Sequence, residues 1–219
     1  MGKGAETRER IIEIAEASVL AKGFGATSIE EIIVEAGITK SGFFYHFKDK
    51  NELAHKMVRR YVDENNRVFD EIFERGHQLS DDPLQAFLIS LKLLAETMSD
   101  LPSGHPGCLI ASICYQERLF DRNVRNLIAQ SVTEWHMRFR AILDDIATVH
   151  RPRDAIDLGD VADMLSCIVD GAIIMSKALN DPKRIERQVL AFRSFVKLLF
   201  SPATAQLEKP PVPDSIQAA

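Results

Sequence analysis

Residues 27–50 of this chain read TSIEEIIVEAGITKSGFFYHFKDK. Ser28 is a favourable N-cap for a helix, and Glu31, three residues later, completes a capping box. Gly37 can adopt the positive φ that ends this helix, and Thr39 can cap a second helix after a tight turn. Two short helices joined by a glycine-containing turn predict a helix-turn-helix motif, whose second helix enters the major groove of DNA.

The wider segment resembles the DNA-binding region of the tetracycline-repressor (TetR) family of bacterial regulators. The resemblance rests on ITKSGFFYHFKDKNEL at residues 38–53, preceded by ATSIEEIIVEAG at residues 26–37. It extends over about residues 8–54, roughly a quarter of the chain. The other three quarters are similar to the family only in length and helical pattern.

The resemblance implies a set of DNA contacts in the motif. Hydroxyl and amino groups there can bind phosphates or base edges. The chain departs from the common family pattern at Phe44, where tyrosine is usual, and Tyr45 can supply the missing hydroxyl. Phe43 and Phe47 are expected to face the core. The expected DNA-binding residues are Thr27, Ser28, Thr39, Lys40, Ser41, Gly42, Phe44, Tyr45, His46 and Lys50.

Charge is distributed unevenly along the chain. The whole chain has a formal net charge of -5, yet residues 36–60 carry six basic and two acidic side chains. A small basic patch on an acidic protein suits a site-specific DNA binder, because the patch engages phosphates while the remaining surface repels them. A solvated charge cluster without a partner is the alternative.

Periodicity and composition predict an all-α protein of about nine helices. Hydrophobic residues make up 46% of the chain, glycine is scarce at 11 residues, and no alternating apolar and polar runs indicate strands. We expect a helix-turn-helix domain at 1–50, a helical ligand-binding and dimerisation domain at 51–202, and a disordered tail at 203–219. Within the second domain we expect a long helix from Lys50 to Arg75, ended by Gly76, and another from Cys108 to Phe120.

The last two expected helices, 157–179 and 183–200, carry apolar stripes wider than one buried face requires. Such stripes indicate packing on a second subunit as well as on the body. A two-fold dimer would place two reading helices on successive half-sites. An ordinary core helix pair is the alternative. No apolar run is long enough to span a membrane and the N-terminus is unlike a signal peptide, so we expect a cytoplasmic protein.

The resemblance also implies that the body encloses a pocket for a small-molecule inducer. Aromatic residues and methionine form an adaptable apolar wall, and His136 can orient a polar group. A filled core without a cavity is the alternative. The candidate ligand-binding residues are Phe69, Phe73, Leu94, Met98, Cys108, Ile110, Trp135, His136, Phe139, Met164 and Ile168.

Three cysteines in the chain raise the alternatives of a thiol enzyme or a metal sensor. Cys108, Cys114 and Cys167 are an odd number without a disulfide framework or a CxxC pair, so neither catalysis, a cofactor nor a metal site is expected. The sequence instead favours a homodimeric repressor released from a palindromic operator by a small, mostly apolar inducer. An activator or a ligand-independent regulator is a variant of that interpretation. The different-class alternative is a helical small-molecule-binding protein or enzyme without DNA binding.

Overall fold

The computed structural model describes residues 2–101 and 104–201 of the chain, and the expected tail at 203–219 lies outside these residues. Within the described residues the protein is all-helical, as predicted. The helices are α1 (Lys3–Lys22), α2 (Ile29–Ala36), α3 (Lys40–His46), α4 (Lys50–Leu79), α5 (Pro83–Ser99), α6 (Leu109–Cys114), α7 (Arg122–Val149), α8 (Leu158–Leu179) and α9 (Lys183–Phe200), with a 3₁₀ turn at Glu117–Leu119.

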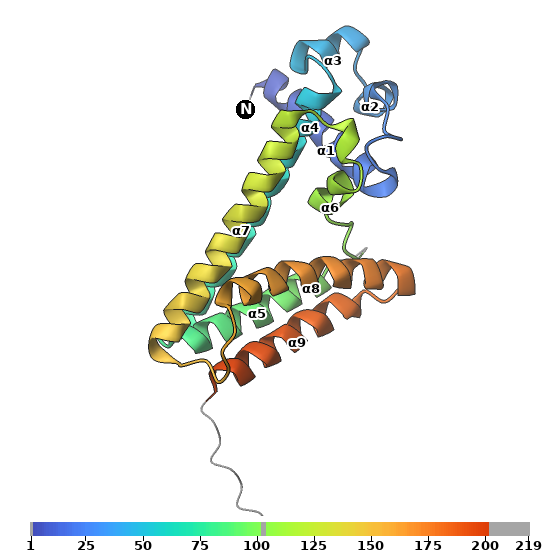
Figure 1. Ribbon diagram of the computed structural model, residues 1–219. Helices are drawn as coiled ribbons and strands as arrows, with labels where there is room; N and C mark the ends of the chain where they lie inside the picture. Colours follow the sequence, from blue (N-terminus) through green and yellow to red (C-terminus); the bar gives the residue numbers. More distant parts are fainter. Residues whose placement is uncertain (1, 102–103, 202–219) are drawn as a thin grey trace, which may run out of the picture.

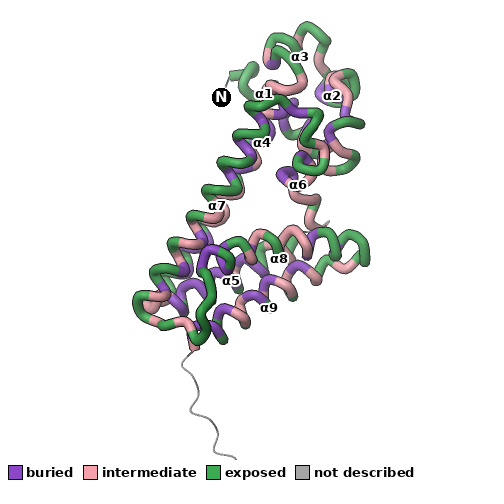
Figure 2. Tube along the Cα trace, in the orientation of Figure 1, coloured by how far each residue is buried: buried purple, intermediate pink, exposed green. Residues whose placement is uncertain are grey.

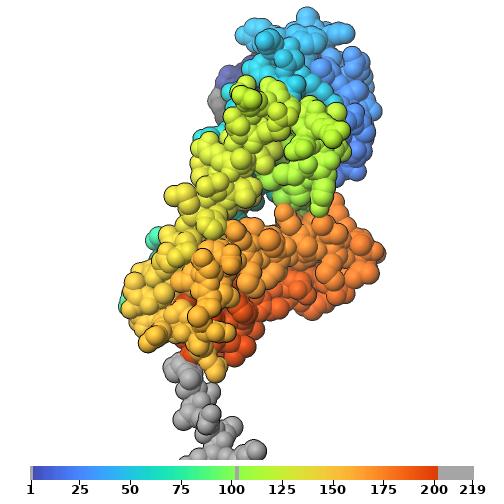
Figure 3. All heavy atoms as spheres, viewed as in Figure 1, coloured from blue at the N-terminus to red at the C-terminus, as the bar shows by residue number. Residues whose placement is uncertain are grey.

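The molecule is elongated, with a small helical head at one end (Figures 1 and 3). We call α1–α3 the head. Helices α4 and α7 run side by side from the head into the body, which consists of α5, α8, α9 and the distal halves of α4 and α7 (Figure 1). Helix α6 lies between the head and the body. In the described part of the chain, no helix combines the length and apolar character that crossing a membrane requires.

Aspartate caps set the starts of the long helices. Asp49, Asp82, Asp121 and Asp157 each accept a hydrogen bond from a backbone N–H of the first turn, at N···O distances of 2.7–3.0 Å. Each cap contributes about 1 kcal/mol. Because these caps are local, the sequence predicted the starts of α4, α5, α7 and α8 to within a residue.

The predicted end of α4 at Arg75 is wrong, because the helix continues through Gly76 to Leu79. Gly76 is buried, and a Cβ atom there would lie 2.1 Å from Ser90 Oγ and 2.6 Å from the Ala86 carbonyl oxygen of α5. Gly76 therefore allows α4 and α5 to pack closely, and it does not end the helix.

The predicted helix from Cys108 to Phe120 is also wrong, because it divides into α6 and the 3₁₀ turn. The break lies near Gln116, whose backbone leaves the helical region at φ -123° and ψ 27°. There the Gln116 side-chain oxygen accepts a hydrogen bond from Gly25 N–H of the head at 3.0 Å. Phe120 packs on Phe24, with ring centroids 4.2 Å apart. Interactions with the head thus replace a continuous helix in this segment.

Two hydrophobic clusters hold the molecule together (Figure 2). The body cluster joins α4, α5, α7, α8 and α9. The head cluster includes residues of α1–α4, but also Leu109 and Ile113 of α6, Phe120, and Val124 of α7. Cys108 and Trp135 pack against both clusters. The hydrophobic core of the head therefore includes side chains of α6 and of the start of α7.

Candidate DNA-binding surface and body cavity

Helix α3 turns one face into the head and the other to solvent. Phe43 is fully buried and Phe47, its C-cap, is 1% exposed, so these two rings fix the helix in the head core as predicted. Tyr45 is 83% exposed and Phe44 45% exposed, and the Lys40 side chain is 71% exposed. The exposed part of α3 consequently presents an amine, a phenol and an apolar ring.

The start of α3 is organised by its own hydroxyl groups. Thr39 Oγ1 accepts a hydrogen bond from Gly42 N–H at 3.1 Å and lies 3.0 Å from Ser41 Oγ. A Cβ atom on Gly42 would lie 3.3 Å from Thr39 Oγ1, so a larger residue would press on the cap. Thr39 and Ser41 remain exposed and lie at the N-terminal end of the helix.

Helix α2 begins with the predicted capping box. Ser28 Oγ accepts from Glu31 N–H at 3.1 Å, and Ser28 N–H donates to the Glu31 carboxylate at 3.0 Å. The bond from the Ser28 backbone, with further bonds from Lys22 and the Ser28 hydroxyl, lowers the pKa of Glu31 to about 2. Gly37 ends the helix with φ 62°, as predicted. These local interactions set where α2 begins and where it ends, just before the turn that leads into α3.

Two expected DNA-binding residues do not lie on the exposed face. Thr27 is 1% exposed, and its hydroxyl donates to the Gly23 carbonyl and pairs with Ser18. Lys50 Nζ donates to the Phe24 carbonyl at 2.6 Å and lies 4.1 Å from the centre of the Phe24 ring, and burial lowers its pKa. Both side chains therefore stabilise the loop before α2 in this structure.

The remaining expected residues lie around the same end of the molecule. Ser28 and His46 are half-buried, with Ser28 occupied by its cap. Sequence reasoning omitted Lys48, which is exposed beside α3 and belongs to the basic patch at 36–60. It also omitted Arg8, whose guanidinium lies 5.3 Å from the centre of the Phe47 ring.

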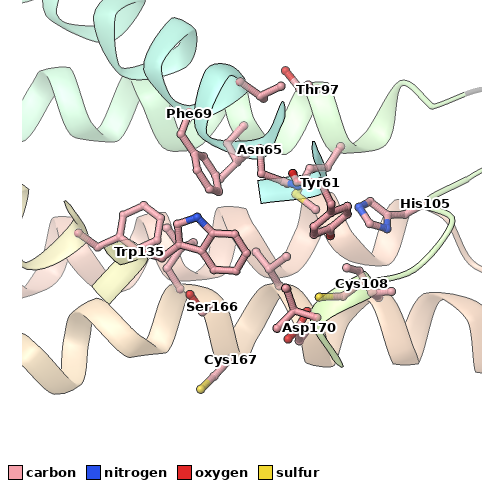
Figure 4. Close-up of a pocket in the computed structure, with 18 of the residues that line it drawn as sticks. Tyr61, Asn65, Phe69, Thr97, His105, Cys108, Trp135, Ser166, Cys167 and Asp170 are labelled. Carbon is pink, nitrogen blue, oxygen red and sulfur yellow. The ribbon is translucent and has the colours of Figure 1, made fainter. Parts of the chain in front are cut away.

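The body contains a cavity of about 410 Å³ bounded by α4, α5, α7, α8 and the segment that leads into α6 (Figure 4). The structure brings together seven of the eleven residues expected to bind a ligand. They are Phe69, Leu94, Met98, Cys108, Ile110, Trp135 and Phe139. The Trp135 indole is held by donating its N–H to Asn66 Oδ1 at 3.0 Å.

The other four expected ligand-binding residues lie elsewhere. Phe73 lines a second, smaller cavity of about 230 Å³ farther along α4. His136 does not line the large cavity and pairs with Asp163 of α8, at 2.7 Å between Nδ1 and Oδ1. Met164 and Ile168 are half-buried and pack against the body cluster. Helical periodicity predicted that they face inward without showing which inward face borders the cavity.

At the polar end of the cavity Tyr61, His105, Cys108 and Asp170 gather (Figure 4), and of these four the sequence predicted only Cys108 as a ligand-binding residue. Burial raises the pKa of Asp170 and the pKa of Tyr61. Burial and the Asp170 carboxylate raise the pKa of Cys108 to about 11. Burial, with the charge of Lys177, lowers the pKa of His105. A signal was available, because Asp170 interrupts the apolar run CIVDGAIIM at 167–175.

The cavity is lined by further residues that were not expected. They include Asn65, Val68, Thr97, Leu101, Val132, Leu165, Ser166, Cys167, Val169 and Ile173. Across the described residues, no three His, Cys, Asp or Glu side chains converge in a way that would hold a metal ion. The three cysteines are free thiols in the structure.

A third surface lies on the outer side of the last two helices. Ile174 and Leu179 of α8 are 55% and 57% exposed, and Leu198 of α9 is 62% exposed. Close to Ile174 on α8 is Gly171, where an added Cβ atom would meet no atom within 4 Å. Apolar side chains beside a glycine form a surface that a second helix can approach closely.

Comparisons with known proteins agree with this geometry. Residues 11–57 match the family model described as bacterial regulatory proteins, tetR family. The HTH-type transcriptional regulator YxaF of Bacillus subtilis (strain 168), described as uncharacterized, is 24% identical over 185 residues, which cover 83% of this chain and 90% of YxaF. YerO of the same strain is 42% identical over 57 residues, 26% of this chain and 20% of YerO.

Solved structures share the fold over most of the chain. A TetR-family transcriptional regulator from Agrobacterium tumefaciens superposes with a TM-score of 0.76 at 18% sequence identity. The superposition covers 91% of this chain and 100% of that one. The arrangement of a head, two connecting helices and a helical body is therefore a known one.

Proposed function

The chain belongs to the TetR family of helix-turn-helix transcriptional regulators, and on that premise we propose that it is a homodimeric repressor released from a palindromic operator by a small inducer. Its membership makes it a DNA-binding regulator rather than an enzyme. The observation that carries the proposal is the exposed face of α3, with Lys40 and Tyr45 held outward by the buried Phe43 and Phe47.

In the proposed complex α3 lies in the major groove. Lys40 and the hydroxyl groups of Thr39 and Ser41 bind phosphates, which gives affinity without sequence information. Tyr45 and Phe44 contact base edges, where the Phe44 ring can pack on a thymine methyl. Thr27 and Lys50 act indirectly, because they stabilise the loop that precedes α2.

Dimerisation through α8 and α9 is supported by their exposed apolar surface. Removing Ile174, Leu179 and Leu198 from water against a second copy would contribute favourably, at roughly 25 cal/mol for each Å² of apolar area. A two-fold axis through this surface would present two copies of α3 to successive half-sites of DNA.

The segment from Cys108 to Asp121 connects the cavity to the head and can transmit a displacement between them. Cys108 lines the cavity and caps α6 by accepting from Ala111 N–H. At the other end of the segment, Gln116 accepts from Gly25 N–H. Asp121 N–H donates to Asn51 at the start of α4, at 3.2 Å. A ligand that displaces Cys108 would therefore move groups that touch the head.

A salt-bridge cluster joins α1 to α4. Arg60 of α4 binds Glu9, Glu13 and Glu16 of α1, with N···O distances of 2.5, 3.2 and 2.9 Å. A shift of α4 at the cavity would then be transmitted to α1 of the head. In a population shift, the inducer lowers DNA affinity only by the difference between its affinities for the two dimer states.

The test is binding to the DNA that flanks the protein's own gene, titrated at several salt concentrations. Lys40→Ala should weaken binding and reduce the salt slope by about two per dimer, because each of the two Lys40 side chains neutralises one phosphate. Tyr45→Ala should change the sequence preference. Lys92→Ala, an exposed lysine of the body, is the control and should leave both unchanged. Unaltered DNA binding in both head variants would refute the proposal.

A further inference from the structure

Among its fully charged side chains, the described lining of the body cavity offers a negative group but no positive one. Of the described residues that line it, Asp170 is the sole carboxylate, and neither lysine nor arginine is among them. His105 is the lining side chain that could carry a positive charge, and burial favours its neutral form because it lowers the pKa. Apart from that carboxylate, the wall is mostly apolar and aromatic.

Asp170 lacks the partner that a half-buried carboxylate usually has. It interacts with the Cys108 thiol, and no cationic side chain of the described residues offsets the burial that raises its pKa. A carboxylate in an apolar setting is costly unless a cation or several hydrogen bonds compensate it. A neutral thiol donates only a weak hydrogen bond. A cationic ligand would thus supply the counter-charge that the described part of the protein does not provide for Asp170.

Aromatic faces lie at a fixed position relative to that carboxylate. Phe69 and Trp135 lie toward one end of the cavity, while Asp170 and Tyr61 lie at the other (Figure 4). Phe69 meets Trp135 edge to face, with ring centroids 6.4 Å apart, and Phe139 at 5.6 Å. A flat apolar group can pack against the sides of these rings that face the cavity, and the Tyr61 ring can face a cation.

We propose that the inducer is an organic cation, an aromatic or bulky apolar body carrying an amine or quaternary ammonium group whose charge is held by Asp170. This inference rests on the proposed function, since it names the chemical class that the cavity takes. The positive group lies between Asp170 and Tyr61, and the apolar body reaches Phe69 and Trp135. An anionic molecule of the same size is disfavoured, because it would bring a second negative charge beside Asp170.

The ammonium group also explains how occupancy reaches α6. Asp170 interacts with Cys108, and Cys108 caps α6. A cation that takes over the Asp170 carboxylate competes with that thiol and releases the start of α6. The polar end of the cavity is thereby both the recognition site and the first step of the route to the head.

Three biphenyl compounds of matched size test the charge requirement: (biphenyl-4-ylmethyl)trimethylammonium, its neutral isostere 4-neopentylbiphenyl, and biphenyl-4-acetate. Trp135 is the single tryptophan of the chain and lines the cavity, so its fluorescence reports binding directly. The cation should bind the full-length wild-type protein at least tenfold more tightly than the neutral isostere, and biphenyl-4-acetate should bind least.

Two variants on α8 separate Asp170 from charge in general. Asp170→Asn should abolish the preference for the cation while retaining affinity for the neutral isostere. Asp163→Asn removes an exposed carboxylate of the same helix that pairs with His136 and should retain the preference. An equal affinity of wild type for cation and neutral isostere, a preference that survives Asp170→Asn, or a failure of all three compounds to quench Trp135 would each overturn the proposal.

Binding to flanking DNA, measured first without any compound, distinguishes failure of this inference from failure of the proposed function. DNA binding that is released by biphenyl-4-acetate or the neutral isostere, but not by the cation, would leave an inducible regulator and refute the cationic class. Absence of DNA binding in the compound-free protein would refute the regulator itself.

Discussion

Gly76 offers a sharp test of how the body is packed. It lies inside α4, where alanine is normally the better residue by about 1 kcal/mol. Yet the Cβ atom of Gly76→Ala would lie 2.1 Å from Ser90 Oγ and 2.6 Å from the Ala86 carbonyl oxygen. Ser90 Oγ is itself bound to that carbonyl at 2.9 Å. The oxygen belongs to the backbone of α5, so it cannot rotate away as a side chain can.

Relief of the overlap requires α4 and α5 to separate along a face that is buried on both sides. Overpacking of this kind costs typically about 1–3 kcal/mol, and distances this short lie toward the upper end of that range. After subtraction of the gain in helix propensity, Gly76→Ala should destabilise the protein by about 1–2 kcal/mol. For a chain of this size, the melting temperature should fall by roughly 2–8 °C.

Thermal unfolding followed by circular dichroism measures the effect, at one protein concentration because the stability of a dimer depends on it. Ser90→Ala in the Gly76→Ala background should restore part of the stability, since it removes one of the two overlaps. Gly4→Ala is the matched control: it also lies in a helix, but its Cβ atom would meet nothing within 4 Å, so stability should be unchanged or slightly higher. Equal or increased stability of Gly76→Ala would show that the two helices are farther apart than described.

Two further predictions concern the head and the dimer. The pKa of Glu31 is depressed from 4.5 to about 2, so its stabilising contribution is present above pH 4.5 and is lost as the pH falls toward 2. Glu31→Gln should therefore reduce the acid sensitivity of the melting temperature in this window, and an unchanged pH profile would contradict the capping role. Ile174→Glu would place charges against each other in the proposed dimer interface of α8 and α9. It should yield monomers in analytical ultracentrifugation and weakened operator binding in gel shift. A variant that remains dimeric would exclude this surface.

The head was predictable because its determinants are local. The capping box of Ser28 and Glu31, the positive φ of Gly37 and the Thr39 cap each involve residues within a few positions of one another. The pattern of α3 also assigned Phe43 and Phe47 to the core and Tyr45 to the surface correctly. Thr27 shows where local sequence patterns stop being sufficient, because its hydroxyl is hydrogen-bonded to that of Ser18 in α1, nine positions away. Nothing in the motif itself reveals that hydrogen bond.

The body was predictable as helices but not as a cavity. A helix that is buried on several faces presents the same apolar pattern toward a packed neighbour and toward an empty space. Met164 and Phe139 are both apolar and inward, yet only Phe139 lines the cavity. Gly76 illustrates the same limit, since glycine after an apolar run indicates both a helix end and a close helix approach. Only the position of Ser90, fourteen residues later, decides between them.

The position of the cavity relative to the two hydrophobic clusters bears on how an inducer can act at all. Close-packed interiors respond to an added group by moving as units rather than by local compression. Cys108 and Trp135 line the cavity and pack against both the head cluster and the body cluster. A ligand that displaces either side chain must therefore change how the two clusters meet. Since α6 and the start of α7 contribute to the core of the head, that change would shift the packing that supports α3. In the proposed mechanism, DNA affinity then changes although the ligand never touches the head.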